Sequence, residues 1–238
     1  MLKVLRHELK YFISDSDVLF IQDLLRSSMI EDRHNEKEGY LVTSIYFDDF
    51  FDSCLIEKLD GVRFRKKFRV RYYNNQSNSA KFEIKQKVDN YISKTSIAIP
   101  DGVLASFNEG NLSELYTFID EAQLFPTPRF LDSFFPVSIV EYQRQAFTLP
   151  FENIRITIDR HLSSYDYQTT LDAGDKFGHL MIPSGLSVLE IKFLHELPWF
   201  LRQLLSSIPA RRTAISKYTI CRQFSAVTRY HDDTGIGW

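Results

Sequence analysis

Cysteine is scarce in this sequence of 238 residues, because only Cys54 and Cys221 are present. Two isolated cysteines exclude a disulfide framework and a paired-cysteine metal site, and they are typical of a reducing compartment. Metal-binding spacings such as HExxH are also missing among the six histidines. No stretch approaches the roughly 20 apolar residues needed to cross a bilayer, and residues 1–12 lack the apolar core of a signal peptide. We therefore expect a soluble, cytoplasmic protein with no membrane span.

A surplus of positive charge is absent too, since 29 Lys and Arg residues face 31 Asp and Glu residues and the net charge is −2. This balance excludes a nucleic-acid binder that works through bulk charge, so any basic surface must be local. The chain contains no Pro/Gly/Ser-rich linker and no internal repeat. A hydrophobic content of 44%, with 20 Phe and 12 Tyr, is typical of a globular, strand-rich protein. We predict one domain over residues 1–228, followed by a polar tail at 229–238.

The most informative feature is a pair of adjacent basic strands between residues 63 and 94. Successive side chains in a strand point to opposite faces, so Arg69 and Arg71 share one face while apolar and aromatic residues occupy the other. In the second strand the same alternation groups Glu83, Lys85 and Lys87. An ordinary surface sheet mixes signs, because like charges opposite each other destabilise a ladder. A basic face this dense indicates that a polyanion binds to it.

Alternating patterns predict eight strands, and apolar residues at helical spacing predict the helices between them. Ser14 or Asp15 is expected to cap the first helix, and Pro198 precedes the last long one. Pro136, with two prolines shortly before it, is expected to act as a breaker. Strands are expected at residues 2–12, 40–48, 91–99, 137–147, 153–162 and 186–194, with the two basic strands on either side of a turn at 74–79. Helices are expected after residue 14, at 112–122, at 199–207 and in the segment SKYTICRQF.

The charged faces of these strands carry far more cations than anions, although the chain as a whole is slightly acidic. Alternation alone favours an antiparallel sheet with its charged face in water. The cationic excess favours a sheet closed into a barrel, with the charged faces inside and the apolar faces under the helices. The predicted fold class is mainly β (α+β), an antiparallel eight-stranded tunnel or barrel with helices packed outside, whose Arg and Lys donors could hold a chain of phosphates. The cations are Arg6, Lys10, Arg69, Arg71, Lys85, Lys87, Lys94, Arg144, Arg155 and Lys192, and the anions are Glu8, Glu83, Asp159 and Glu190.

Seven short motifs follow one another in an order that resembles the VTC domain. They are RHELKY, FRVRYY, FEIKQK followed by SK, EYQRQAF, IRITIDR, VLEIKF and ISKY, and together they span about residues 4 to 222. The VTC domain is the polyphosphate polymerase module of the vacuolar transporter chaperone complex, within the CYTH-like triphosphate tunnel metalloenzymes. The resemblance implies an antiparallel eight-stranded tunnel, in agreement with the barrel inferred from the charged faces.

The resemblance also implies roles for individual residues. The implied catalytic residues are Arg69, Arg71, Arg144, Lys217 and Glu190. The implied phosphate-binding residues are Lys10, Lys85, Lys94, Arg155, Tyr142 and Ser216. Glu190, with Glu8, would hold the divalent cofactor, Mn²⁺ or Mg²⁺.

The implied chemistry is transfer of the γ-phosphoryl group of ATP onto a growing polyphosphate chain, for which a cage of cations and a divalent metal suffices. The implied ligands are ATP and polyphosphate or pyrophosphate, with no nucleic acid. Arg6 stands where hydrolytic relatives carry the first of two glutamates, which favours the polymerase, and Ala214 stands where some eukaryotic members carry a lysine. Eukaryotic members also contain a regulatory SPX domain and membrane helices, so regulation or membrane coupling is expected from a separate polypeptide. A metal-dependent triphosphate hydrolase and a non-catalytic polyphosphate- or nucleotide-binding module are the alternatives.

Three further expectations concern the charged residues around the tunnel. Glu83 and Asp159 are expected to neutralise neighbouring cations. Removing Arg69 or Arg144 is expected to leave the fold intact, because crowded like charges repel. A solvated strand end is favoured over a basic patch at the tunnel mouth for Arg63, Arg65, Lys66 and Lys67.

Overall fold

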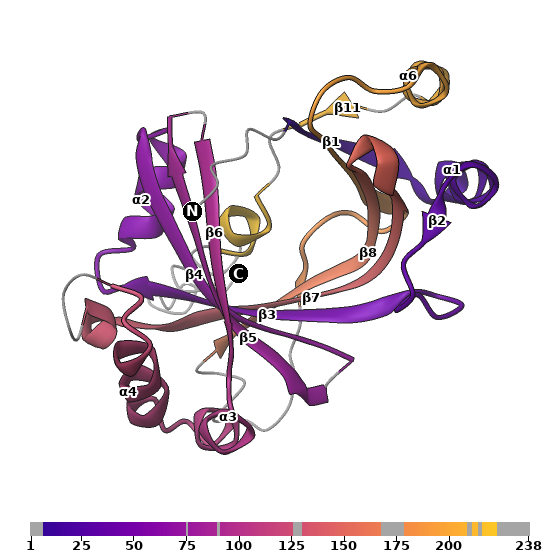
Figure 1. Ribbon diagram of the computed structural model, residues 1–238. Coiled ribbons are helices and arrows are strands. Elements are labelled where there is room, and N and C mark those ends of the chain that lie inside the picture. The colour runs from indigo at the N-terminus through magenta and orange to yellow at the C-terminus, as the bar shows by residue number, and fades with distance from the viewer. Residues whose placement is uncertain are drawn as a thin grey trace, which may run out of the picture.

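The computed structural model describes residues 7–74, 76–89, 91–125, 130–167, 179–208, 211–213 and 216–222. One curved antiparallel sheet dominates these residues (Figure 1). The long strands follow one another across the sheet in the order β1 (His7–Ser14), β10 (Leu186–Phe193), β8 (Ile154–Asp166), β7 (Phe134–Leu149), β3 (Tyr40–Asp49), β4 (Phe64–Tyr73), β5 (Gln76–Val88) and β6 (Tyr91–Ala98). Two-residue strands extend it: β2 (Ile30–Glu31) pairs with β7, β9 (His179–Leu180) with β8, and β11 (Arg211–Arg212) with β1. The predicted mainly-β, antiparallel fold with eight long strands is confirmed.

The predicted closure of the sheet into a hydrogen-bonded barrel was wrong for the part of the chain that the structure describes. The ladder runs from β11 to β6, and no pairing joins β6 to β1 within the described ranges. Side chains approach across this gap, since Glu8 Oε2 on β1 lies 3.6 Å from Lys85 Nζ on β5. The strands therefore enclose the inner face by curvature and by side chains rather than by a continuous ladder.

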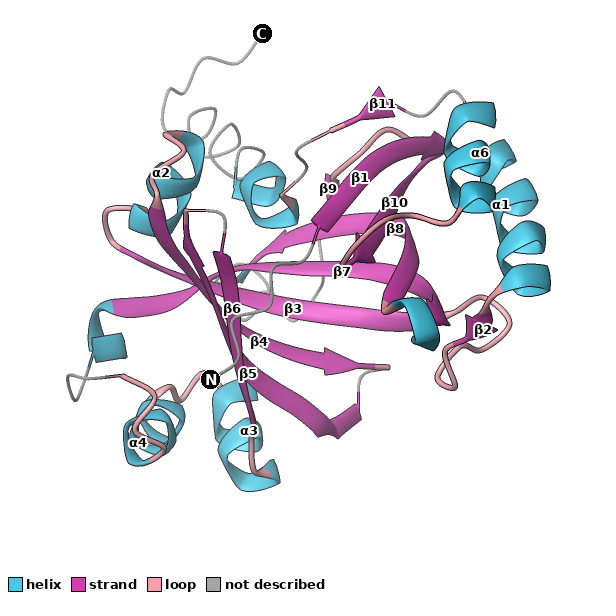
Figure 2. Cartoon of the chain, turned by 45° about the horizontal axis from the view of Figure 1, so that its top comes forward, coloured by secondary structure: helices cyan, strands magenta, loops and turns pink. Residues whose placement is uncertain are grey.

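Two apolar cores lie on the outer face of the sheet, each under its own helices (Figure 2). The helices α1 (Asp15–Ser28) and α6 (Trp199–Ser207) cover β1, β10 and β8, whereas α3 (Asp101–Asn108) and α4 (Ser113–Glu121) cover the β3–β5 region. Each fully buried Leu, Ile or Phe stabilises the fold by about 1.5–3 kcal/mol. The first core includes Val18, Ile21, Leu25, Ile156, Leu189 and Leu201; the second includes Phe47, Phe82, Leu104, Phe107, Leu115 and Ile119. With the apolar faces outside, the charged faces point inward.

Local sequence signals explain where several helices begin. Ser14 caps α1, because its Oγ accepts a hydrogen bond from the Asp17 backbone N–H at 3.2 Å, and the acidic residues Asp15 and Asp17 favour the positive end of the helix. Helix α6 starts directly after Pro198, as predicted. Residues 217–222 are helical, as predicted for the SKYTICRQF segment. Among the helices of the described ranges, none is long and apolar enough to cross a bilayer.

The structure differs from the predicted elements at three places. The turn predicted at 74–79 is shorter, since β5 already begins at Gln76. Pro136 does not end a segment but lies within β7, at a register shift of the β3–β7 ladder. Tyr46 faces Ser138 and Phe47 faces Pro136, so β7 contains an extra residue there, and an irregular ladder tolerates a missing N–H donor. The short helix α2 (Ser53–Leu59) was not predicted; Asp48 begins it by accepting backbone hydrogen bonds from Cys54 and Leu55. Arg6, Ala214 and the tail at 229–238 lie outside the described residues.

Candidate functional site

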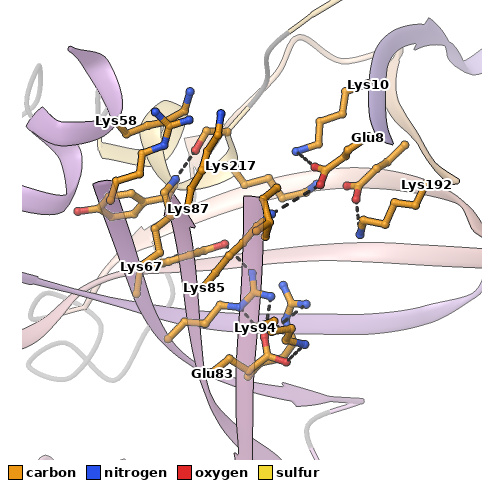
Figure 3. Close-up of a pocket in the computed structure, with 18 of the residues that line it drawn as sticks. Glu8, Lys10, Lys58, Lys67, Glu83, Lys85, Lys87, Lys94, Lys192 and Lys217 are labelled. Carbon is orange, nitrogen blue, oxygen red and sulfur yellow. Dashed lines mark hydrogen bonds and ion pairs between the residues drawn. The ribbon is translucent and has the colours of Figure 1, made fainter. Parts of the chain in front are cut away.

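A cavity of about 330 Å³ lies on the inner face of the sheet (Figure 3). Among the residues that the structure describes, twelve Lys and Arg side chains line it, against three carboxylates. The sequence-predicted residues that it brings together are Glu8, Lys10, Arg69, Arg71, Lys85, Lys94, Tyr142, Arg144, Glu190, Ser216 and Lys217. The residues not named from the sequence as site residues are Tyr46, Lys58, Arg65, Lys67, Glu83, Lys87, Ile92, Lys192, Thr213 and Tyr218. The cationic excess inferred from strand alternation is therefore concentrated in one cavity.

Arg69 and Arg71 extend side by side from β4 over a buried carboxylate. Glu83 on β5 accepts from Arg69 Nε at 2.7 Å and pairs with Arg69 Nη2 at 2.6 Å, and Lys94 on β6 also pairs with it. Arg71 donates to the hydroxyls of Ser44, at 3.0 Å, and Tyr142, at 3.1 Å. Burial would raise the pKa of Glu83, but the nearby Arg69, Arg71 and Lys94 lower it to about 2. Glu83 thus stays ionised and fixes the cations around it, as expected from the sequence.

Arg144 on β7 lines the cavity and forms an ion pair with a fully buried carboxylate, Asp159. Its Nε and Nη2 donate to the two carboxylate oxygens of Asp159 on β8 at 2.6 and 2.8 Å, and Lys217 Nζ lies 2.6 Å from Asp159 Oδ2. Asp159 is fully buried, which opposes its ionisation, yet Arg144 and Lys217 hold its pKa below the ordinary value. The Tyr142 ring lies beneath both cations, with its centroid 5.1 Å from Arg144 Cζ and 4.7 Å from Lys217 Nζ. Because Asp159 depends on Arg144, we revise the expectation that removing Arg144 leaves the fold intact.

Arg65 and Lys67 line the cavity, so the expectation of a solvated strand end was wrong for both residues. Lys67 Nζ donates to Ser216 Oγ at 2.8 Å and lies 5.1 Å from the centroid of the Tyr218 ring. Burial and the nearby cations, led by Lys58 and Lys85, lower the pKa of Lys67 to about 7. Strand alternation could have found it, since Lys67 has the same parity as Arg69 and Arg71. By contrast Arg63 is 76% exposed and pairs with Asp89, as a solvated strand end should.

Arg155 was predicted to line the tunnel, but the structure places it outside the cavity. Its Nη2 lies 2.8 Å from Asp32 Oδ2 and 3.3 Å from the Tyr40 hydroxyl. Arg155 shares the face of Asp159 on β8 but lies farther along the strand. Alternation gives the face of a residue and not its position along the cavity, which explains this correction.

Comparisons with known proteins agree with the architecture of the sheet and cavity. The family model of the VTC domain matches residues 5–225. The chain belongs to the VTC domain family. A search of curated protein sequences finds no match. Among solved structures, a protein from Pyrococcus horikoshii OT3 superimposes with a TM-score of 0.50 at 12% identity, covering 93% of this chain and 99% of that chain. A proposed adenylate cyclase from Vibrio parahaemolyticus gives a TM-score of 0.50 at 11% identity, covering 92% and 98%. At these identities the likeness shows the fold alone.

The carboxylates of this VTC domain that could hold a divalent metal lie on neighbouring strands. On β1, Glu8 pairs with Lys10 at 2.7 Å, and on β10, Glu190 pairs with Lys192 at 2.5 Å. Burial opposes the ionisation of Glu190, but Lys192 and Lys10 hold its pKa well below the ordinary value. Within the described ranges no group of three or more His, Cys, Asp or Glu side chains forms a metal cluster. Mg²⁺ is commonly held by one or two carboxylates together with substrate phosphates. Glu8 and Glu190 fit that arrangement.

Strand β8 of the VTC domain contains one extra residue shortly after Asp159. Glu141 on β7 faces Ser163, but Gln143 faces Arg160, so β8 contains one more residue than β7 at this point. His161 occupies the bulge with a left-handed φ of 53°. Asp159 and Ser164 are five positions apart, so a regular strand would place their side chains on opposite faces. Asp159 nevertheless pairs with Lys217 and Ser164 interacts with Cys221, and both of these partners lie in the helical residues 217–222, because the bulge shifts the alternation. The bulge therefore lets residues on both sides of it, Asp159 and Ser164, contact the same C-terminal segment.

We expect His161→Val to lower the free energy of unfolding by about 1–2 kcal/mol, because a β-branched residue is strained at positive φ. His161→Gly should retain or increase stability, since glycine adopts this φ freely. Only His161→Val should also weaken tripolyphosphate binding, measured by calorimetry. Asn153 has a φ of 51° at the start of β8 and does not line the cavity, so Asn153→Val should cost stability without loss of affinity. Equal affinities for the two valine variants would contradict a role of the bulge in positioning Asp159.

Proposed function

We propose that this VTC domain is a polyphosphate polymerase that transfers the γ-phosphoryl group of ATP onto the end of a polyphosphate chain. The observation that carries the proposal is the cavity of twelve cations and three carboxylates, in which each carboxylate is already paired with a cation. Such a cavity suits a ligand with many closely spaced negative charges. Phosphoryl transfer depends mainly on positioning and on stabilising charge, which fixed Arg and Lys side chains supply.

The chemistry of the acceptor favours transfer over hydrolysis. A terminal oxygen of the chain forms the new bond to the γ-phosphorus, the bond from that phosphorus to the β,γ-bridging oxygen breaks, and ADP leaves with the electron pair. This acceptor oxygen is already anionic, so no side chain needs to remove a proton. Attack by water would require removal of one, and the pKa values of Glu8, Glu83 and Glu190 are all lowered, which makes these carboxylates weak bases.

The cavity residues have separable roles in this proposal. Arg69, Arg71 and Arg144 use N–H groups not engaged by their carboxylate partners to hold phosphoryl oxygens, and Lys217 closes over them from the C-terminal segment. Glu190, with Glu8, would hold Mn²⁺ or Mg²⁺, which would neutralise charge on the nucleotide phosphates.

A triphosphate hydrolase is the second candidate, favoured by the neighbouring carboxylates Glu8 and Glu190 at one end of the cavity. The test is to incubate the protein with ATP and Mn²⁺ or Mg²⁺ and to measure ADP, free phosphate and polymer together. We expect ADP and polyphosphate with little free phosphate, because a chain held in the cavity has an entropic advantage over water. Stoichiometric free phosphate without polymer would identify a hydrolase, and neither product would identify a binding module.

Replacing Glu190 with glutamine should remove turnover and retain binding of polyphosphate, because the carboxylate repels phosphate unless a metal lies between them. Calorimetry with and without Mn²⁺ measures the binding, and ADP release measures turnover. Glu196→Gln is the matched control, since Glu196 is exposed and does not line the cavity. Unchanged turnover in Glu190→Gln would exclude the proposed metal role.

A further inference from the structure

Four cations gather at one end of the cavity, and we call them the α2 cluster: Lys58 of α2, Arg65 and Lys67 of β4, and Lys87 of β5. Figure 3 shows Lys58, Lys67 and Lys87 together on one side, with Glu8, Lys10 and Lys192 on the other. The cavity therefore has two chemically different ends.

The α2 cluster differs from the other cations by having no carboxylate partner within the described part of the chain. Arg65 donates to the Val62 carbonyl at 3.1 Å and Lys67 to Ser216, and no ion pair involves Lys58 or Lys87 there. At the opposite end Lys10 and Lys192 pair with Glu8 and Glu190. Uncompensated cations held close together repel one another, and an anion removes that repulsion.

We propose that the α2 cluster is a separate subsite for the polyphosphate chain, while the Glu8 and Glu190 end holds the metal-bound triphosphate of the nucleotide. This inference rests on the proposed function and gives the cavity a direction. A metal–nucleotide complex needs carboxylates for its cation, and a bare phosphate chain needs only positive charge. The growing chain would extend past α2, away from the carboxylates.

Chain binding at this subsite should also take up a proton. The cations that act electrostatically on Lys67 are Lys58 of α2, Lys85 of β5, Lys10 of β1 and its neighbour Arg69. Its contacts on the C-terminal segment are Ser216 and Tyr218. Because its pKa is about 7 without ligand, much of Lys67 is neutral at pH 8. A bound phosphate chain favours the charged form, so binding at pH 8 should draw a proton from the buffer and weaken as the pH rises.

The first test compares two ligands by calorimetry without turnover: long-chain polyphosphate, and a non-hydrolysable ATP analogue with Mn²⁺. We expect Lys58→Ala/Lys87→Ala to lower the affinity for the chain by roughly tenfold or more and the affinity for the analogue by less than about twofold. Lys66→Ala/Lys81→Ala is the control, since these lysines lie on β4 and β5 and do not line the cavity. Parallel losses for both ligands, or no loss for either, would overturn the subsite.

The second test measures the proton uptake by titrating the chain at pH 8 in buffers of different ionisation enthalpy. The parent protein should take up a proton, and Lys67→Arg, which stays charged, should take up clearly less. Equal uptake by both would contradict the assignment to Lys67. If the chain-specific loss is observed but ATP yields no polymer, the proposed polymerase fails while the chain subsite stands, so the two failures are distinguishable.

Discussion

Replacing Arg144 with alanine is expected to lower the free energy of unfolding by about 3–5 kcal/mol, because it leaves a buried charge with only part of its compensation. The charge is Asp159, which is fully buried and accepts two hydrogen bonds from Arg144 and a third from Lys217. The same change should abolish stabilisation of the protein by polyphosphate, since it removes a cavity cation. Urea unfolding with and without the ligand measures both effects.

A matched arginine and a double variant separate these two effects. Arg160 on the same ladder pairs with Glu38, whose side chain is 69% exposed, so Arg160→Ala should cost at most about 1 kcal/mol. Arg144→Ala/Asp159→Asn should recover part of the stability, because no buried carboxylate remains, and it should still fail to bind the chain. An Arg144→Ala variant as stable as Arg160→Ala would contradict the buried-pair interpretation.

Replacing Lys67 with methionine should raise the free energy of unfolding, whereas Arg144→Ala lowers it. Like Arg144→Ala, it should weaken the binding of polyphosphate. The pKa of Lys67 is about 7 in the folded protein, and the pKa of a lysine in an unfolded chain is about 10.4. Between these values the unfolded state holds more protons, so the unfolding free energy of the parent rises with pH. The destabilisation by Lys67 is complete below pH 7 and shrinks as the pH rises towards 10.

We therefore expect Lys67→Met to raise the unfolding free energy at pH 6 by on the order of 1–3 kcal/mol, with a smaller gain at pH 9. Polyphosphate should raise the melting temperature of this variant less than that of the parent. Lys66→Met is the control, since Lys66 is the next residue of β4 and does not line the cavity. A destabilised Lys67→Met variant at pH 6, or an unchanged pH dependence, would show that the cations do not repel one another as described.

Strand alternation predicted the inner face of the sheet because its period of two depends only on local backbone geometry. It placed Arg69, Arg71, Lys85 and Arg144 together correctly. It could not give positions along the cavity, so it included Arg155. Arg65 and Lys67 have the parity of Arg69, but they were assigned to a solvated strand end and line the cavity instead. Nor could it show which edges of the sheet pair, because pairing of β1 with β6 depends on curvature accumulated over all the strands.

The parts of the site that the sequence did not reveal come from irregular segments. Lys58 lies on the short helix α2, which has too few turns to give a periodic signal. Its first turn is held by the carboxylate of Asp48 on β3, which accepts a hydrogen bond from the Cys54 backbone N–H. The bulge at His161 was not predicted either, because a single extra residue has no compositional signature. The motif order of the family nevertheless placed Lys217 correctly, which local alternation alone could not do.

A crystal structure with a non-hydrolysable ATP analogue and Mn²⁺ tests most directly the claim that this cavity holds the reacting triphosphate. The account predicts phosphate oxygens within hydrogen-bond distance of Arg69, Arg71 and Arg144, with the metal between the phosphates and Glu190, and the α2 cluster free of the nucleotide. Triphosphate bound outside the cavity, at a concentration that saturates the protein in solution, would contradict it.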